Sequence, residues 1–337
     1  MRALIRTTLA SAALAVAMPA SAQVAGVPQP EQACQRECLE GFVDRYLQAM
    51  ADGRLDPALF APTARFTENG VELPLGNEGL WATTSSVGNY KLYVPDVETQ
   101  QVAFLGTVFE QVGTSAAGPM REPEAVGLVL RLRIVDGKIT EIEQLAARPD
   151  RPIGGGPAPE TSTNPFPAVG AAVEALGAPH PHFAEIIPEN ERHTREELVA
   201  VGNAYFDAVE RNTGKEYYPF TDDCLRLENG LVIAGPEGSG ARAGGCKEQL
   251  ETSLFDVVTS IRDRRFVAVD RERGLVFAFA FFDHRQINWT WQIGELFKIE
   301  NGLISRIEAI FPRAPYGTCS GWSTYEQCRS EKIQDVR

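Results

Sequence analysis

The 337-residue chain lacks the signatures of several common protein classes. No apolar run reaches the roughly 18 residues that a membrane-spanning helix needs. The sequence has no G-x-S-x-G, P-loop or H-E-x-x-H motif and no G-x-G-x-x-G in a strand-to-helix context. Serine hydrolases, nucleoside triphosphatases, zincins and dinucleotide-dependent enzymes are therefore unsupported. Basic residues are outnumbered by acidic ones, 32 to 45, and the formal charge of −13 argues against nucleic-acid and anionic-membrane partners.

The composition that remains is that of a folded protein. Hydrophobic residues make up 44% of the chain and charged residues 23%, which is enough for a core and too apolar for general disorder. At roughly 100–200 residues per domain, the length predicts two domains.

The first 22 residues have the pattern of a secretory signal peptide. Arg2 and Arg6 precede an apolar stretch over 9–17, and Ala20-Ser21-Ala22 matches an A-x-A cleavage site. The apolar stretch is short for the alternative, an N-terminal membrane anchor. We expect an exported protein, periplasmic or secreted.

An even number of cysteines fits export to an oxidising compartment. The six are Cys34, Cys38, Cys224, Cys246, Cys319 and Cys328. Cys224 with Cys246 and Cys319 with Cys328 are the natural local pairs. Cys34 and Cys38 are too far apart for a bridge in a regular helix, so either that turn is irregular or they pair elsewhere. Without a C-x-x-C pair, and with Pro181 separating two of the histidines, we predict no metal site and no cofactor.

The two halves of the chain repeat each other around a linker. Nine of the 22 prolines fall within residues 149–188, which predicts a linker over 149–193 with one short helix at 169–176. On either side, residues 45–50 match 204–209, residues 67–70 match 227–230, and residues 136–143 match 301–308. These ordered matches predict a duplication, with domains at 33–148 and 194–313 and a disulfide-stapled tail at 314–337.

Each copy has the same predicted elements in the same order. A helix (37–51; 194–211) precedes a short strand (64–68; 224–228), a variable helical region and three long strands. Asp136-Gly137 and Asn301-Gly302 predict tight hairpin turns between the last two strands. This order is typical of an α+β fold in which helices pack on a curved antiparallel sheet and form a cone with an apolar interior.

The sequence resembles the nuclear-transport-factor-2-like superfamily over residues 35–147 and 194–312. The segments RYLQAMADGRLD at 45–56 and ARFTE at 64–68 are similar to the start of a ketosteroid isomerase. The superfamily also includes polyketide cyclases, dehydratases, lyases acting on lignin-derived diaryl compounds, and pure binding domains. The resemblance implies two tandem cone-shaped domains.

The resemblance also implies candidate catalytic residues. Tyr46 and Tyr205 fall on the tyrosine that stabilises an oxyanion, and Glu68 and Glu228 fall on the proton-shuttling carboxylate. The second carboxylate of the isomerases falls on Glu295 in the second copy. The first copy has a leucine, Leu130, at the corresponding place. A tyrosine on the apolar face of a helix is also common as a simple core residue.

Strand alternation tests these carboxylates independently, because alternate side chains share a sheet face. Glu295 is the single charge on a face with Trp289, Trp291, Ile293 and Phe297, which predicts a raised pKa. The alternative is an ion pair with Arg285 or an edge position. Glu228 shares its face with Arg226, so a structural ion pair is its alternative.

Further residues are candidates for binding and proton transfer. His284 is a possible proton-transfer group, although the neighbouring Asp283 must face the opposite way. A flat apolar ligand would contact aromatic side chains, or these side chains simply pack a core; they are Trp81, Tyr90, Tyr93, Phe104 and Phe109 in the first copy and Trp289 and Trp291 in the second.

These observations predict a cofactor-independent lyase, dehydratase or isomerase that uses acid–base catalysis on a small hydrophobic molecule, aromatic ones included. The rival is a non-catalytic periplasmic module that binds a small molecule or acts as a scaffold. A second rival is an inactive first copy that only supports an active second one. We expect either a homo-oligomer or an internal pseudo-dimer packed sheet to sheet.

Overall fold

The computed structural model describes residues 33–111, 122–150, 164–237, 239, 244–252, 257–325 and 328–334. Residues 33–337 cluster as one compact unit, separate from residues 1–32. The predicted signal peptide at 1–22 lies outside the described residues. No helix in the described ranges is long and apolar enough to cross a membrane.

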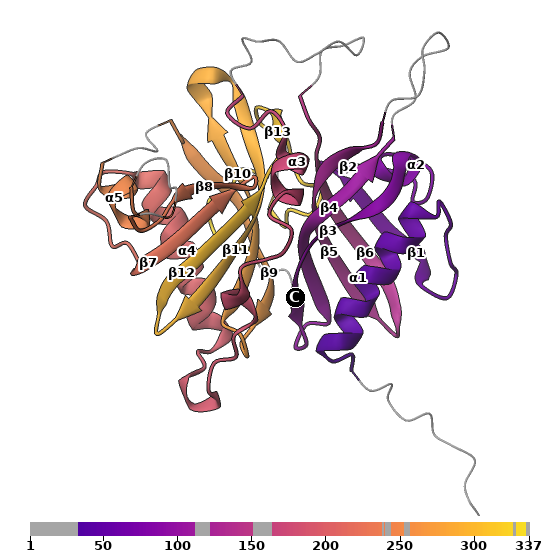
Figure 1. Cartoon of the computed structure of the whole chain (residues 1–337), viewed down its shortest axis with the longest axis horizontal. Helices are drawn as coiled ribbons and strands as arrows, with labels where there is room; N and C mark the ends of the chain where they lie inside the picture. Colours follow the sequence, from indigo (N-terminus) through magenta and orange to yellow (C-terminus); the bar gives the residue numbers. More distant parts are fainter. Residues whose placement is uncertain are drawn as a thin grey trace, which may run out of the picture. The chain divides into compact units, whose positions relative to one another are not determined.

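The first half is a six-stranded sheet with a long helix on one face (Figure 1). Its sheet order is β2-β1-β6-β5-β4-β3. The elements are α1 (Arg36–Ala51), β1 (Phe60–Glu68), β2 (Val71–Glu72), α2 (Leu80–Thr83), β3 (Thr84–Asp96), β4 (Gln101–Glu110), β5 (Glu124–Val135) and β6 (Lys138–Ala147).

The second half repeats this architecture in a seven-stranded sheet of order β8-β7-β12-β11-β10-β9, with β13 added to β11. Its elements are α4 (Arg195–Arg211), β7 (Phe220–Glu228), β8 (Leu231–Ala234), α5 (Cys246–Glu251), β9 (Ser260–Asp270), β10 (Leu275–His284), η3 (Arg285–Ile287), β11 (Trp289–Glu300), β12 (Leu303–Ile310) and β13 (Arg313–Pro315). Between the halves lie α3 (Val169–Glu174), η1 (Pro181–Ala184) and η2 (Glu189–Glu191).

The α+β prediction is confirmed, with two corrections to the sheets. Four long strands, not three, follow the short helix in each half, because β3 and β9 were missed as strands. The sheets are also mixed rather than wholly antiparallel, since β1 pairs with β6, and β7 with β12, in parallel. The missed strand β3 begins with polar residues and has an irregular register between Val87 and Lys91, so its alternation is weak.

Local sequence signals explain the elements that were predicted. Thr194 caps α4 in a capping box with Glu197, which satisfies free backbone N–H groups at the helix start. Asp136 and Asn301 adopt positive φ values of 49° and 52° in the hairpin turns before β6 and β12. Asparagine and aspartate tolerate this left-handed conformation, which the two-residue hairpin requires.

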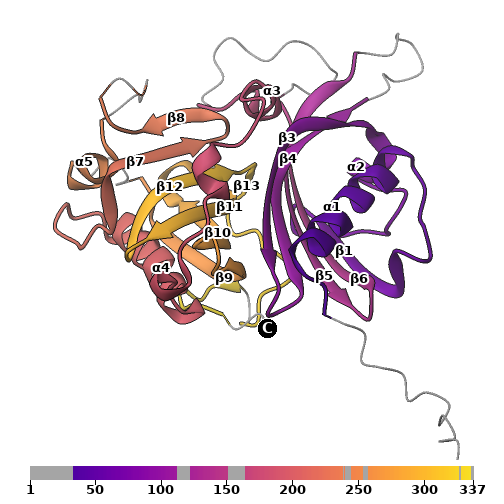
Figure 2. The same cartoon turned by 60° about the horizontal axis from the view of Figure 1, so that its bottom comes forward.

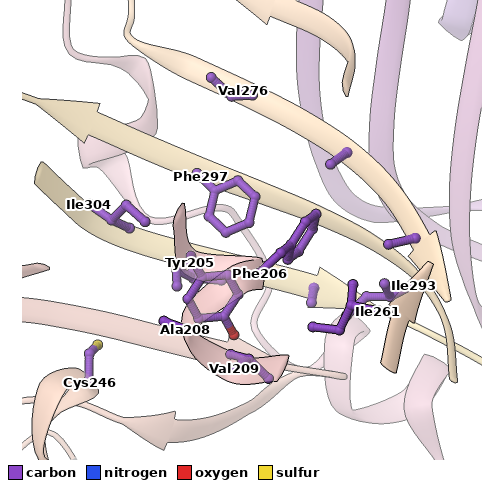
Figure 3. Close-up of a cluster of buried hydrophobic side chains, with 14 of the residues drawn as sticks. Tyr205, Phe206, Ala208, Val209, Cys246, Ile261, Val276, Ile293, Phe297 and Ile304 are labelled. Carbon is purple, nitrogen blue, oxygen red and sulfur yellow. The ribbon is translucent and has the colours of Figure 1, made fainter. Parts of the chain in front are cut away.

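Each half has its own hydrophobic core between its long helix and the inner face of its sheet. In the second half, Tyr205 and Phe206 of α4 pack against Phe297 of β11 (Figure 3). A third cluster joins the opposite faces of the two sheets and includes Leu105 and Phe277. Both sheets are therefore covered on both faces, which fixes the orientation of each strand (Figure 2).

Ion pairs between the halves are reciprocal. Asp96 at the end of β3 pairs with Arg195 at the start of α4. Asp270, at the end of β9, pairs with Arg36 at the start of α1 at 2.6 Å. Each aspartate thus contacts the helix of the other half, as equivalent residues do across a two-fold interface.

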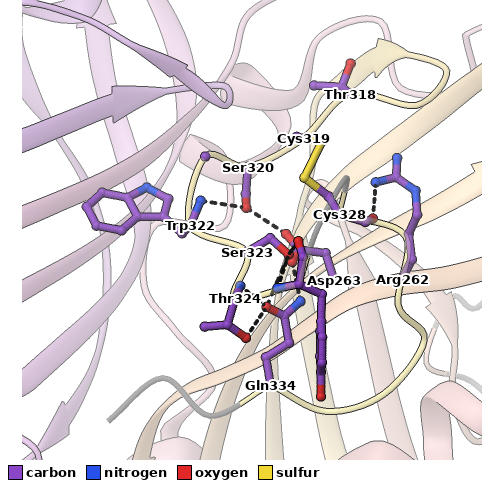
Figure 4. The surroundings of a disulfide bond; sticks show 12 residues. Arg262, Asp263, Thr318, Cys319, Ser320, Trp322, Ser323, Thr324, Cys328 and Gln334 are labelled. Atoms are coloured by element: carbon purple, nitrogen blue, oxygen red, sulfur yellow. Dashed lines mark hydrogen bonds between the residues drawn. A yellow bond between two sulfur atoms is a disulfide. The ribbon is translucent and has the colours of Figure 1, made fainter.

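All six cysteines form disulfides: Cys34–Cys38, Cys224–Cys246 and Cys319–Cys328. Helix α1 begins at Arg36, so Cys34 lies outside it, and the irregular-turn alternative for this pair is correct. The third disulfide closes a C-terminal loop. Ser320 within this loop and Gln334 beyond it donate hydrogen bonds to the buried Asp263 (Figure 4).

Candidate functional site

The strand register places a row of inward-facing residues across each sheet. In the second half, β7, β12, β11 and β10 contribute Glu228, Ala309, Glu295 and Ala278. In the first half, β1, β6, β5 and β4 contribute Glu68, Gln144, Leu130 and Phe104 at the equivalent positions. The second half therefore has two carboxyl groups flanked by small alanines, where the first half has one carboxylate and three larger side chains.

Glu295 is the most unusual residue of the second row. Its side chain is 1% exposed, and within the described structure its Oε2 atom has no hydrogen-bond partner. Burial, reinforced by the negative charge of Glu228, raises the pKa of Glu295 to about 8. The carboxyl group is therefore mostly protonated at neutral pH. In that form it is a hydrogen-bond donor.

Tyr205 brings a second hydroxyl to Glu295. It lies on α4, is 2% exposed and is close enough to Glu295 to act on the pKa of that carboxyl group. Burial and the nearby Glu295 raise the pKa of Tyr205 well above its usual value, so the phenol stays neutral. The predicted tyrosine and second carboxylate are thus brought together.

Glu228 lies at the edge of this cluster and is paired. Its Oε1 is 3.3 Å from Nε of Arg226, and its side chain is 16% exposed against 0% for Arg226. Arg226 also donates a hydrogen bond to Gln249 of α5. Since residues 226 and 228 share one strand face, the ion pair that alternation offered as the alternative is present.

In the first half, hydrogen bonds and an ion pair link the polar residues of the row to one another and to their neighbours. The hydroxyl of Tyr46 donates to Gln144 Oε1 at 2.8 Å, and Trp81 Nε1 donates to the Tyr46 oxygen at 3.0 Å. Gln144 Nε2 donates to Glu68 at 2.8 Å, and Arg148 forms a 2.8 Å ion pair with Glu68. Glu68 is therefore not the unpaired carboxylate that the sequence suggested, because a guanidinium neutralises it.

The aromatic candidates fall into separate places. Trp81 and Phe104 belong to the first-half core. Tyr90 faces the other way and donates a hydrogen bond to Glu308 of the second half. The expectation that Tyr90 shares a cavity with Trp81 is therefore corrected, because Tyr90 belongs to the cluster between the two sheets and Trp81, on α2, belongs to the first-half core.

The second-half aromatic residues gather at one end of the inner face. Trp291 contacts the rings of Trp289, His284 and Phe311, with centroid separations of 5.6, 6.0 and 4.9 Å. Along β11, Trp291 lies four residues from Glu295, or about 13 Å of extended chain. Trp291 and Phe311 also line a groove of about 320 Å³ with Phe166, Arg148 and Arg313 among its other walls.

His284 is held apart from its neighbour Asp283, as alternation required. Its Nδ1 is 3.0 Å from the carbonyl oxygen of Phe282, and burial lowers its pKa. Asp283 instead forms an ion pair with Arg262 at 2.8 Å.

One group of potential metal ligands occurs among the described residues. His182, Glu185 and Glu300 place their ligand atoms within 4.8 Å of one another. The two nitrogens of His182 face different carboxylates, at 2.8 Å from Glu185 and 2.6 Å from Glu300. This geometry is that of a histidine bridging two acids, since one ring cannot direct both nitrogens at a single ion.

A family model described as Domain of unknown function (DUF8021) matches residues 32–146 and 191–311. The chain belongs to this family. The two matched segments of this DUF8021 protein each contain one helix-covered sheet. No curated protein matches the chain.

Several solved structures are similar to one half of this DUF8021 protein. They include a putative ketosteroid isomerase from Kribbella flavida (15% identity, 40% of this chain and 93% of that chain, TM-score 0.28). An NTF-2 like protein of unknown function from Burkholderia xenovorans is 13% identical, with 35% of this chain and 84% of that chain covered and a TM-score of 0.26. An LEH-like epoxide hydrolase from M. tuberculosis is 13% identical, with 34% of this chain and 83% of that chain covered and a TM-score of 0.27. TM-scores this low carry no argument about activity.

The architecture predicted for each half of this DUF8021 chain, a long helix on a curved sheet in an α+β fold, is present in both halves. Sequence reasoning missed Gln249, Gln144 and Arg148, which complete the two polar clusters. Gln249 and Arg148 had no local signal, because each contacts a residue of a different element. Gln144 could have been identified by aligning the last two strands of each half, because it is a polar residue at the position where the second half has Ala309.

Proposed function

We propose that the second half carries a cofactor-independent acid–base site, that of an isomerase, lyase or dehydratase acting on a small hydrophobic molecule. The observation that carries the proposal is Glu295, a carboxyl group that is 1% exposed, whose Oε2 has no hydrogen-bond partner among the described residues and whose pKa burial raises to about 8. A neutral carboxyl group in an apolar site donates a hydrogen bond to developing negative charge.

The proposed chemistry removes a proton from a carbon next to a carbonyl group. Glu228 accepts the proton while the electron pair moves onto the carbonyl oxygen, and Tyr205 and Glu295 provide the donors that stabilise this oxyanion. Returning the proton to another carbon completes an isomerisation, and loss of a leaving group completes a lyase or dehydratase reaction. Glu228 is the carboxylate of this cluster that forms an ion pair, with Arg226.

The row geometry supports placing a substrate between the two carboxyl groups. Glu228 and Glu295 are separated by one strand, so their backbones lie about 10 Å apart. The residue between them is Ala309. Its methyl group occupies less space above the sheet than the side chain of Gln144, which holds the equivalent position in the first half. The aromatic rings that pack around Trp291 favour a flat substrate.

The second candidate is a small-molecule-binding module without catalysis. It is favoured by the ion pairs of both candidate bases, Glu68 with Arg148 and Glu228 with Arg226, because each carboxylate already has a cationic partner. Such a module would bind the same flat molecules through the aromatic residues and leave their protons unexchanged.

Hydrogen–deuterium exchange tests the proposal without knowledge of the natural substrate. The probe is 2-tetralone, a flat aromatic ketone with exchangeable protons beside its carbonyl group, followed by proton NMR in D₂O. We expect exchange above the buffer rate that falls by roughly 10²–10⁴-fold in Glu228→Gln. Glu295→Gln should also slow it, and the control Glu189→Gln, an exposed residue, should not.

The outcomes separate the two candidates. Exchange that is equally fast in all three variants, or absent with the wild type, contradicts the enzyme. Saturable binding of 2-tetralone without exchange supports the binding module.

We also propose that the protein is exported. The three disulfides are consistent with an oxidising compartment. Cell fractionation with detection of a chain that begins at Gln23 tests this proposal.

A further inference from the structure

A buried arginine that acts electrostatically on Glu295 has its ion pair with a different carboxylate, Glu228. Arg226 is fully buried, yet its ion pair is with Glu228, and Glu295 Oε2 accepts no hydrogen bond from any described residue. Arginine and a neighbouring carboxylate ordinarily form charge-assisted hydrogen bonds, frequently two in parallel. Something therefore directs the guanidinium group toward Glu228.

Gln249 is the residue placed to do so. Its Oε1 accepts a hydrogen bond from Nη2 of Arg226, and its Nε2 donates to the backbone oxygen of Ile233 at 2.7 Å. Because a guanidinium only donates and a carbonyl only accepts, these two partners fix which way the amide points. Gln249 is 1% exposed, so no water competes for its oxygen.

The backbone around Gln249 is tied to the strand that carries Arg226. Gln249 lies on α5, three residues after Cys246, which is bonded to Cys224. Cys224 precedes Arg226 by two residues on β7 and shares its sheet face. The disulfide therefore holds the helix with the acceptor next to the strand with the guanidinium.

We propose that Gln249 is a positioning residue that holds the guanidinium of Arg226 on Glu228 and away from Glu295. This inference rests on the proposed function, in which protonated Glu295 is a donor. The charged and titratable groups that act on Glu295 are Tyr205 from α4 and Arg226 and Glu228 from β7. Gln249 itself is neutral and acts only through Arg226.

The test measures the titration of Glu295 directly, by carbon NMR of the carboxyl groups in the full chain, with Glu295→Gln used to assign the signal. In Gln249→Leu the guanidinium is released and turns to Glu295, so the titration midpoint falls by about one pH unit or more. In Gln249→Glu the new carboxylate retains Arg226, and the midpoint stays at or above the wild-type value.

Gln101→Leu is a matched control, because Gln101 is also buried and accepts a hydrogen bond from Arg131 at 2.7 Å in the first half. An unchanged midpoint in Gln249→Leu, a lowered one in Gln249→Glu, or an equal shift in Gln101→Leu overturns the inference. If Gln249→Leu does not fold, Gln249→Met takes its place, since methionine has a similar length and no hydrogen-bond acceptor for Arg226 of comparable strength, and its midpoint should fall in the same way.

The titration needs no substrate, so it can be read apart from the exchange of 2-tetralone. A shifted midpoint with no exchange in any form of the protein leaves Gln249 as the positioning residue and removes the proposed reaction. Exchange that depends on Glu295, with a midpoint indifferent to Gln249, keeps the reaction and removes the positioning role.

Discussion

Replacing Glu295 by leucine gives a stability measurement that tests the buried carboxyl group directly. Leucine is the residue at the equivalent first-half position, Leu130, so the fold already accommodates it there. The substitution removes a group whose pKa is raised from 4.5 to about 8 by burial, next to the negative charge of Glu228. We expect a more stable protein at pH 7, at the expense of the proposed activity.

The magnitude follows from proton linkage. Below pH 4.5 the carboxyl group is protonated in both the folded and the unfolded chain, so Glu295 makes no pH-dependent contribution. Between pH 4.5 and 8 the unfolded chain releases the proton and the folded chain retains it, so stability falls as pH rises. At about 1.4 kcal/mol per pH unit, the loss reaches roughly 3 kcal/mol at pH 7.

Urea unfolding of the wild type and Glu295→Leu at a series of pH values provides the assay. Burial also raises the pKa of Glu308, to about 7, but Glu308 is present in both proteins and its effect cancels in the difference. The free energy of unfolding of the variant should exceed that of the wild type by an amount that grows from pH 4.5 to pH 8. Parallel pH profiles would refute the reasoning, since they would mean that Glu295 titrates normally.

Two further predictions concern the same half. Ala309→Gln introduces into the second-half row the same side chain as Gln144, which bridges Tyr46 and Glu68 in the first half. It should reduce the exchange of 2-tetralone by at least tenfold. Unchanged exchange would show that the substrate does not lie over this row. Replacing Cys224 and Cys246 together by alanine should lower the free energy of unfolding, measured by urea unfolding, by about 3 kcal/mol, because the closed loop of 22 residues constrains the unfolded chain. Replacing Cys319 and Cys328 is the control. Their loop of 9 residues is shorter, so the loss of unfolding free energy should be smaller.

The sequence predicted the parts of the fold that local interactions determine. The helix at 194–211 has a capping box at Thr194, and the turn at Asn301-Gly302 needs a residue that tolerates positive φ, so both are determined by neighbours in the chain. The missed strand β3 has no such signal. Its place at the sheet edge depends on pairing with β4 through an irregular register.

The candidate site divides in the same way. Glu295 and the Arg226–Glu228 pair were identified because alternation along one strand determines which side chains share a face. The partners of Glu68 lie 76 residues away at Gln144 and 80 residues away at Arg148, and only the folded sheet brings them to it. Sequence periodicity places a carboxyl group in an interior. Whether that group has a charge partner there depends on tertiary contacts.

The two halves differ in how completely their inward-facing polar groups are satisfied. In the first half every polar group of the row is satisfied, with Gln144 bridging Tyr46 and Glu68, and this is the arrangement that favours folding. The second half retains a buried acid that lowers its stability near neutral pH, with alanines on both sides of it. The reciprocal pairs Asp96–Arg195 and Asp270–Arg36 fasten the fully satisfied half to the other, which helps to offset that loss. A destabilised group that is supported by the rest of the structure is expected where a protein needs the group for its chemistry.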